Sequence, residues 1–168
     1  LGTGVVISGN GIIITNHHVI EGASNIFIHV YSKTDTKKYP VKVIGVDAIT
    51  DIAVLQITTL PLPKSISSVT WAEEITIAEI GDDIYTIGHP QGMGWTVSKG
   101  VIGHTERNVT SPWQTFIQHD SLIMPGNSGG GMFDEQGHLA GINTILIPSR
   151  DQTNTTAWSL SLTNEEGK

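Results

Sequence analysis

The fold class is decided by residues 5–15, which read VVISGNGIIIT, two short runs of apolar and β-branched residues around an Asn-Gly pair. Asn10 and Gly11 tolerate the positive φ angles of a tight turn, so this stretch predicts a β-hairpin. The same character extends over the chain, which has 23 Ile, 12 Val and 19 Thr among 168 residues, against 7 Ala and 9 Leu. Because side chains branched at Cβ suit a pleated sheet better than a helix, we predict an all-β protein.

The remaining strands are predicted from short apolar runs separated by turn-forming residues. They cover residues 26–31, 41–46, 52–57, 84–88, 96–103, 115–119, 131–133, 139–147 and 157–162. Residues 16–23 are too short and polar for a strand and predict a single helical turn, and residues 163–166 have the pattern of a helix capping box. The Pro-bearing stretch 58–64 breaks strand pairing and is the candidate hinge between two halves. About a dozen short strands without a long helix indicate barrels or a sandwich.

The composition excludes several classes of function. The net charge is −7, from 9 Lys+Arg against 16 Asp+Glu, which argues against nucleic acid as a partner. No apolar run approaches the ~20 residues of a membrane-spanning helix. There is no cysteine, and the seven histidines lack metal-ligand spacing, so we expect no disulfide, no metal and no cofactor. The chain opens at Leu1 without a signal segment, which indicates an excised or processed piece.

Three polar segments carry the chemistry. They are TNHHV at residues 15–19, TDIAVL at 50–55 and PGNSGGG at 125–131. A serine hydroxyl is a poor nucleophile until an imidazole takes its proton, and that imidazole needs an acceptor on its other nitrogen. The glycines around the serine leave backbone N–H groups free to meet negative charge on an attacked carbonyl. Together these segments predict a nucleophilic serine hydrolase.

The order of His, Asp and Ser along the chain distinguishes the known classes of serine hydrolase. Here it is His, then Asp, then Ser, whereas subtilisin-type enzymes run Asp-His-Ser and α/β-hydrolases run Ser-acid-His. Residues 126–130 do contain the G-x-S-x-G string of α/β-hydrolases. Strand-forming residues follow that string, and not the helix that a nucleophile elbow requires.

In this order the segments resemble the trypsin-fold serine proteases of the HtrA (Deg) branch. Residues 15–20 are similar to its T-N-x-H-V motif, and residues 50–55 are similar to its T-D-I-A-V-L motif. Further similar segments are IGHP at 87–90, TVSKG at 96–100, IQHD at 117–120, GNSGG at 126–130 and GINT at 141–144. The resemblance implies two antiparallel six-stranded β-barrels, residues 1–63 and 64–168, with the active site in the cleft between them and no PDZ domain in this chain.

The resemblance also assigns roles. It implies a catalytic triad of His18 (not His17), Asp51 and Ser128, with the backbone N–H groups of Gly126 and Ser128 as the oxyanion hole. Residues implied to bind substrate are Ile123, Met124, Trp158, Ser159 and Leu160. A large Trp158 and an apolar Ile123 predict a shallow pocket for small aliphatic side chains. Asn127 has no charge to pair with a new N-terminal ammonium, so activation is predicted to come from ordering of the loops and not from N-terminal cleavage.

The implied function is a serine endopeptidase that cleaves unfolded or exposed polypeptide segments through an acyl-enzyme, in protein quality control or processing. The implied location is periplasmic or otherwise extracytoplasmic, and relatives of this kind suggest a homotrimer for the full-length protein. The alternative is a catalytically silent pseudoprotease of the same fold, acting as a binding or metal-associated scaffold.

Overall fold

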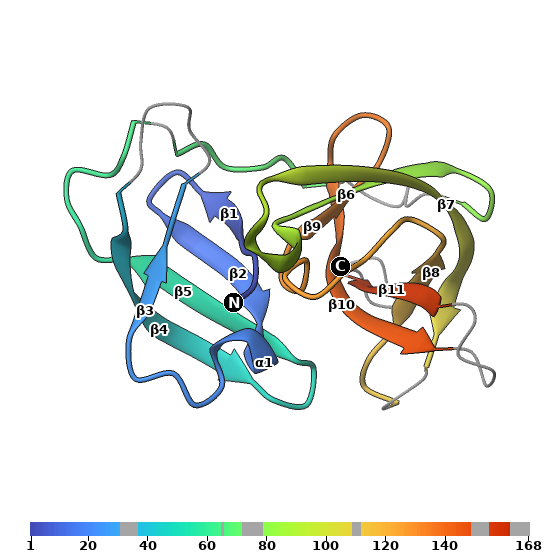
Figure 1. Ribbon diagram of the computed structural model, residues 1–168, viewed down its shortest axis with the longest axis horizontal. Helices are drawn as coiled ribbons and strands as arrows, with labels where there is room; N and C mark the ends of the chain where they lie inside the picture. The colour runs from blue at the N-terminus through green and yellow to red at the C-terminus, as the bar shows by residue number, and fades with distance from the viewer. Residues whose placement is uncertain (31–36, 65, 72–78, 109–111, 149–154, 162–168) are drawn as a thin grey trace.

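The computed structural model describes residues 1–30, 37–64, 66–71, 79–108, 112–148 and 155–161. The chain forms two β-rich halves that lie side by side (Figure 1). The predicted all-β class is confirmed, and each predicted strand is present, most of them with one or both ends shifted by a few residues. The predicted capping box at 163–166 lies outside the described residues. No helix in the described ranges is long and apolar enough to cross a bilayer.

The first half is a five-stranded antiparallel sheet with the order β1-β2-β5-β4-β3. Its strands are β1 (Val5–Ser8), β2 (Ile12–Asn16), β3 (Ile26–Ile28), β4 (Tyr39–Asp47) and β5 (Ile52–Ile57). The predicted hairpin joins β1 to β2, with Ser8 opposite Ile12 and Gly11 at a φ of 82°. The predicted helical turn is α1 (His17–Ile20), which begins where β2 ends. Because β2 ends beside the start of β5, residues that follow β2 and precede β5 meet at one edge.

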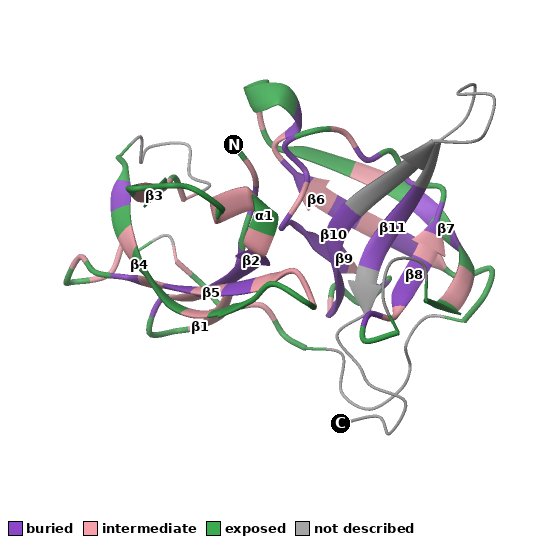
Figure 2. Ribbon diagram, turned by 90° about the horizontal axis from the view of Figure 1, so that it is seen from below, coloured by how far each residue is buried: buried purple, intermediate pink, exposed green. Residues whose placement is uncertain are grey.

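The second half is a closed six-stranded barrel with the order β10-β11-β8-β7-β6-β9. Its elements are β6 (Asp83–Gly88), the 3-10 turn η1 (Pro90–Gly92), β7 (Thr96–Arg107), β8 (Phe116–His119), β9 (Gly131–Phe133), β10 (Leu139–Pro148) and β11 (Thr155–Ser161). A cluster of buried side chains fills the barrel, namely Ile84, Ile102, Ile117, Met132 and Ala140. Figure 2 shows buried residues along most of the barrel strands.

The first half differs from the closed six-stranded barrel that the sequence predicts, because the described residues supply only five strands there. The outer edge of β1 is occupied by the connecting segment, whose Val69 N–H donates to the Val6 carbonyl at 3.0 Å. The next residue, Thr70, accepts a hydrogen bond from Leu139 N–H of β10 at 2.9 Å. The connector therefore binds both halves. The boundary at residue 63 stays a prediction.

An apolar cluster joins the two halves. Val5 and Ile14 from the first half pack with Leu139 and Ile142 from the second, and all four side chains are buried. Burial of one such aliphatic side chain contributes about 1.5–3 kcal/mol. This shared core fixes the edge of β2 against β10, and the polar residues described next lie along that junction.

Candidate active site

His18 and Asp51 form a pair held by two contacts. The His18 ring nitrogen Nδ1 lies 2.7 Å from Asp51 Oδ2, and the His18 backbone N–H donates to Asp51 Oδ1 at 2.9 Å. His18 is in α1, directly after β2, and Asp51 is in the turn before β5. The pairing of β2 with β5, in which Asn16 lies opposite Ile52, brings them together.

Asp51 adopts an uncommon backbone conformation, with a φ of 59°. Asp tolerates this left-handed region better than most residues, though a non-Gly residue there generally costs about 1–3 kcal/mol. Its carbonyl accepts hydrogen bonds from His17 N–H at 3.0 Å and from Asn16 Nδ2 at 3.1 Å. Backbone and carboxylate are thus both anchored, so the orientation of the carboxylate toward His18 is set by four contacts.

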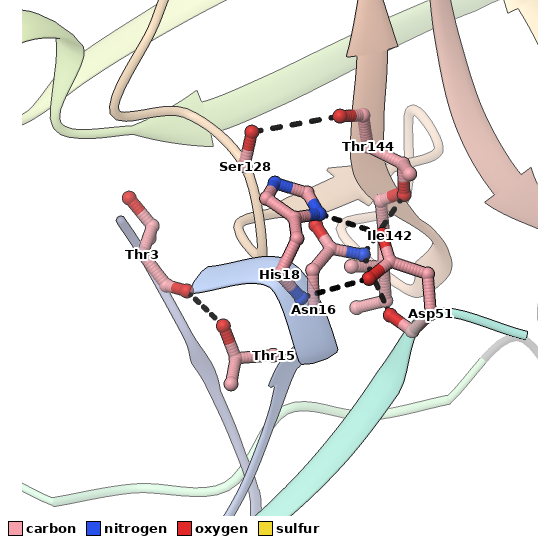
Figure 3. A network of polar contacts seen from close by, with 8 residues as sticks. All are labelled: Thr3, Thr15, Asn16, His18, Asp51, Ser128, Ile142 and Thr144. Carbon is pink, nitrogen blue, oxygen red and sulfur yellow. Dashed lines mark hydrogen bonds and ion pairs between the residues drawn. The ribbon is translucent and has the colours of Figure 1, made fainter. Parts of the chain in front are cut away.

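The chemistry of His18 follows from this pair. The hydrogen bond to the Asp51 carboxylate raises the pKa of His18 above its ordinary value; partial burial opposes the rise, and the negative charge of Asp51 adds to it. When Nδ1 carries the proton and donates it in a hydrogen bond to Asp51, the other ring nitrogen, Nε2, is unprotonated and can accept a proton. Figure 3 shows Nε2 directed toward the side of the site where Ser128 lies.

Ser128 reaches the same place from the second half. Its hydroxyl makes a long hydrogen bond, 3.5 Å, to the carbonyl of Thr144 in β10. The Thr144 hydroxyl accepts a hydrogen bond from Asn16 Nδ2 at 3.0 Å, and Asn16 also holds Asp51 (Figure 3). In the described part of the chain, Ser128 makes no hydrogen bond to His18. The structure therefore places the three predicted residues in one polar network, with the serine hydroxyl turned to Thr144.

Asn16 is a site residue that the sequence reasoning missed. It is fully buried, and its amide nitrogen bridges the Asp51 carbonyl of the first half and the Thr144 hydroxyl of the second. Asn16 stands in the segment that resembles the T-N-x-H-V motif, but only the three-dimensional arrangement shows the bridge. The signal in the sequence was its place in that motif, at the end of a strand of β-branched residues.

The loop before Ser128 presents its backbone in a fixed way. The Pro125 carbonyl accepts a hydrogen bond from Gln91 N–H at 2.8 Å, and the Asn127 carbonyl accepts one from Gly130 N–H at 2.9 Å. In a trans peptide the N–H points opposite to the carbonyl, so the N–H groups of Gly126 and Ser128 are directed away from these partners. Neither N–H has a hydrogen-bond partner among the described residues. Two backbone N–H groups on alternate residues, without partners in the described part of the chain, are the kind of donors that an oxyanion hole uses.

Glycine is needed at two positions of this loop. Gly126 has a φ of 104°, and a Cβ there would lie 2.5 Å from the His89 carbonyl oxygen. Gly129 has a φ of 83°, and a Cβ there would lie 2.1 Å from both the Thr3 carbonyl oxygen and Thr15 Oγ1. The loop is packed against the N-terminal segment too closely for any side chain at 129.

The residues predicted to bind substrate fall into two groups. Ile123 is buried and Met124 is partly buried, in the loop that leads to Gly126. Trp158 and Ser159 are buried in the barrel, where the Trp158 ring packs edge-on against Phe116. Both edges of β11 are paired over residues 157–160, with β10 and β8, so Leu160 offers no open backbone edge. Their role in substrate binding stays a prediction.

A second buried network lies next to the first. Ser159 Oγ donates to Asn143 Oδ1 at 3.0 Å, so the His119 Nε2–H, 2.9 Å from Ser159 Oγ, is the donor to that hydroxyl. Burial lowers the pKa of His119 to about 4, so the ring is neutral near pH 7. The Asn143 backbone carbonyl accepts a hydrogen bond from Gly129 N–H at 2.9 Å. This bond connects the network to residues 125–130, the loop that carries Ser128, called the serine loop below.

No metal centre competes with this interpretation in the part of the chain that the structure describes, where no three His, Asp or Glu side chains gather in a group that could hold an ion.

Asn127 is buried beside Gly88 and carries no charge. The predicted mode of activation through loop ordering stays a prediction.

Comparisons with known proteins agree with the geometry. A family model described as "Trypsin-like peptidase domain" matches residues 2–142. The periplasmic serine endoprotease DegP of Salmonella typhimurium is 37% identical over 151 residues, which are 88% of this chain and 30% of that protein. A probable periplasmic serine endoprotease, DegP-like, of Chlamydia trachomatis is 38% identical over 148 residues, 87% of this chain and 28% of that protein. This chain therefore spans less than a third of the length of these relatives.

Solved structures give the same result. The HtrA-type protease AlgW, solved with a decapeptide, superposes with a TM-score of 0.82 at 34% identity, covering 96% of this chain and 48% of that one. The serine endoprotease from Yersinia pestis superposes with a TM-score of 0.77 at 32% identity, covering 95% of this chain and 53% of that one. The HtrA/DegP-type serine proteases are therefore similar to this chain in sequence and fold, and the chain belongs to the trypsin-like peptidase domain family.

Proposed function

We propose that this chain is the proteolytic domain of an endopeptidase that cleaves unfolded or exposed polypeptide segments through an acyl-enzyme. Ser128 attacks the peptide carbonyl while His18 Nε2 takes the hydroxyl proton, and Asp51 keeps the imidazole oriented. The N–H groups of Gly126 and Ser128 stabilise the oxyanion of the tetrahedral intermediate. His18 then gives its proton to the leaving amine, and water resolves the acyl-enzyme by the same route.

The observation that carries this proposal is the pairing of His18 with Asp51 at 2.7 Å, in a network that ends at the hydroxyl of Ser128. An imidazole whose Nδ1 is fixed by a carboxylate and whose Nε2 is free is the base that a serine nucleophile requires. The backbone N–H groups of Gly126 and of Ser128 itself, which have no hydrogen-bond partner among the residues that the structure describes, are the donors that the oxyanion needs.

We infer that one movement of the Ser128 side chain leads from this arrangement to the reactive one. The Ser128 hydroxyl must leave the Thr144 carbonyl, to which its bond is long, and turn toward His18 Nε2. A rotation about the single Cα–Cβ bond of Ser128 redirects the hydroxyl without a change in the backbone. Catalytic hydrogen bonds are often loose before substrate binds and tighten in the complex.

The substrate class rests on the relatives. They are named periplasmic serine endoproteases, and AlgW was solved with peptides. We therefore propose polypeptide substrates and an extracytoplasmic location. A homotrimer of the full-length protein and a role in quality control or processing belong to the same proposal, since this chain spans only part of its relatives.

The test is hydrolysis of an unfolded, fluorophore-labelled protein and of an internally quenched peptide. Ser128→Ala should lower turnover by about 10⁶-fold, as triad serines do, while Ser98→Ala, a serine of β7 outside the loop, should leave it unchanged. Binding of the unfolded protein without any cleavage by the parent would support the silent scaffold instead.

A further inference from the structure

Thr3 lies in the N-terminal segment before β1 and is 8% exposed. It contacts the serine loop on both sides of Asn127. We propose that Thr3 is a positioning residue of the oxyanion hole. Its hydroxyl holds the peptide between Gly126 and Asn127, which joins the two peptides that carry the Gly126 and Ser128 N–H groups. The proposal rests on the proposed function and adds to it a residue outside the predicted triad and hole.

The geometry of the loop shows what Thr3 contributes. Each of the four successive carbonyls from Pro125 to Ser128 accepts one hydrogen bond. Gln91 N–H and Gly130 N–H supply the bonds to residues 125 and 127. Thr3 supplies the other two, its hydroxyl to the Gly126 carbonyl at 2.7 Å and its backbone N–H to the Ser128 carbonyl at 2.8 Å. Two of the four hydrogen bonds that these carbonyls accept therefore come from one residue of the other half of the molecule.

The bond to Gly126 matters most, because glycine has no Cβ to restrict its dihedral angles. The bond from Gln91 to the Pro125 carbonyl orients the peptide on the N-terminal side of Gly126. The bond from Thr3 to the Gly126 carbonyl orients the peptide on its C-terminal side. With both peptides held, neither dihedral angle of Gly126 is free, and its N–H keeps one direction. Without the Thr3 hydroxyl, one of the two constraints is gone.

Thr3 is itself held firmly enough to act as an anchor. Its backbone carbonyl accepts the Thr15 hydroxyl of β2 at 2.6 Å. Its own hydroxyl, while donating to Gly126, accepts His89 N–H at 3.2 Å. Thr3 thus connects β2, which leads to His18, with the loop that carries Ser128, so the base and the oxyanion donors are held by one set of contacts.

The experiment compares Thr3→Val, which keeps the shape and removes the hydroxyl, with Thr3→Ser, which keeps the hydroxyl. A matched control is Thr86→Val, because Thr86 is a buried threonine of the barrel whose hydroxyl bonds Ser121 Oγ at 2.9 Å and the Ser98 carbonyl at 3.5 Å, and none of residues 125–130. The readouts are kcat and KM for a quenched peptide and the midpoint of urea unfolding, measured in the full-length protein. Thr3→Cys, whose thiol is a weak donor, replaces Thr3→Val if the valine variant does not fold.

Thr3→Val, or Thr3→Cys in its place, should lower kcat by about 10- to 100-fold with KM within about twofold of the parent, since misplaced groups cost about that much. Thr3→Ser should restore kcat, and Thr86→Val should lower the unfolding midpoint without a matching loss of kcat. Unchanged kcat in Thr3→Val, or failure of Thr3→Ser to restore it, overturns the role of Thr3 while Ser128-dependent hydrolysis by the parent keeps the proposed function. A parent without Ser128-dependent hydrolysis overturns both.

Discussion

The two halves of the molecule prepare their parts of the site to different degrees. In the first half, His18 and Asp51 are already paired, with backbone and carboxylate of Asp51 both anchored. In the second half, the hydroxyl of Ser128 still rests on the Thr144 carbonyl, at a distance that allows only a weak bond. In this structure the His18–Asp51 pair is therefore formed, whereas the Ser128 hydroxyl is not bonded to His18.

The difference has a structural origin. His18 and Asp51 sit at the ends of two strands that pair directly, so one β-ladder determines their separation. Ser128 belongs to a loop whose shape depends on Thr3, Gln91 and Asn143, residues far apart in the sequence. The position of His18 relative to Asp51 therefore depends on one pair of strands. The position of Ser128 depends on several long-range contacts, and a change in any one of them can move it.

Removal of the base tests whether the two halves act as one unit. His18→Ala should lower kcat by about 10⁶-fold, and the double variant with Ser128→Ala should lose no more than either single variant, because members of a triad are not additive. Peptide hydrolysis, measured with a stopped assay long enough to detect the residual rate, checks this. Losses that add in the double variant would mean that the two residues act separately.

Asp51→Asn sharpens the comparison within the first half. It should lower kcat by about 10⁴-fold, because the imidazole then loses the carboxylate that selects its tautomer. In the parent, His18 must be neutral to act as a base, so kcat/KM should rise with pH, with a midpoint above the ordinary histidine pKa, since Asp51 raises the pKa of His18. In the variant that midpoint should move to lower pH. An unchanged midpoint in the variant would show that Asp51 does not raise the pKa of His18.

His119 probes the barrel and not the triad. Its pKa is lowered to about 4 in the fold, whereas an unfolded histidine titrates near 6.5. Between these values the unfolded state binds more protons, so the free energy of unfolding should fall as the pH falls from 6.5 to 4, by about 3 kcal/mol in all. Urea unfolding at a series of pH values measures this, and His119→Gln should flatten that part of the curve. An equal slope in both proteins would refute a neutral buried ring.

Asn16→Ala breaks the bridge between the halves. The variant leaves the Thr144 hydroxyl without its donor and removes one of two donors from the Asp51 carbonyl. We expect a loss of about 1–3 kcal/mol of stability and about a tenfold loss of kcat, as a misplaced group costs up to about 100-fold. Asn25→Ala, at an exposed position, is the control. Full activity in Asn16→Ala would show that the bridge does not position the site.

The sequence predicts much of this structure because its strongest signals are local. The turn at Asn10-Gly11 can be recognised from two consecutive residues. The strand Ile52–Ile57, in which buried and partly buried side chains alternate, can be recognised from six. The first half has five strands in its described residues, and Val69 covers the edge of β1 through a contact 63 positions away. This arrangement was not predictable in the same way. Long-range contacts of that kind leave no periodic trace in a sequence.

The same distinction holds in the site. Resemblance to a family pointed to His18, Asp51 and Ser128, and the fold brings them into one network. It assigned no role to Asn16 or Thr3, whose proposed importance comes from where a single amide or hydroxyl reaches across the junction. The predicted exposure of Trp158 to substrate also depends on such detail, since its ring packs on Phe116 inside the barrel.

The central claim is that His18 makes one particular hydroxyl, that of Ser128, nucleophilic. The most direct measurement is reaction of the protein with diisopropyl fluorophosphate, followed by mass-spectrometric mapping of the modified residue. We predict a single adduct, on Ser128, whose rate of formation falls at least about 10⁴-fold in His18→Ala. An adduct on another residue, or a rate at Ser128 that does not depend on His18, would contradict the account.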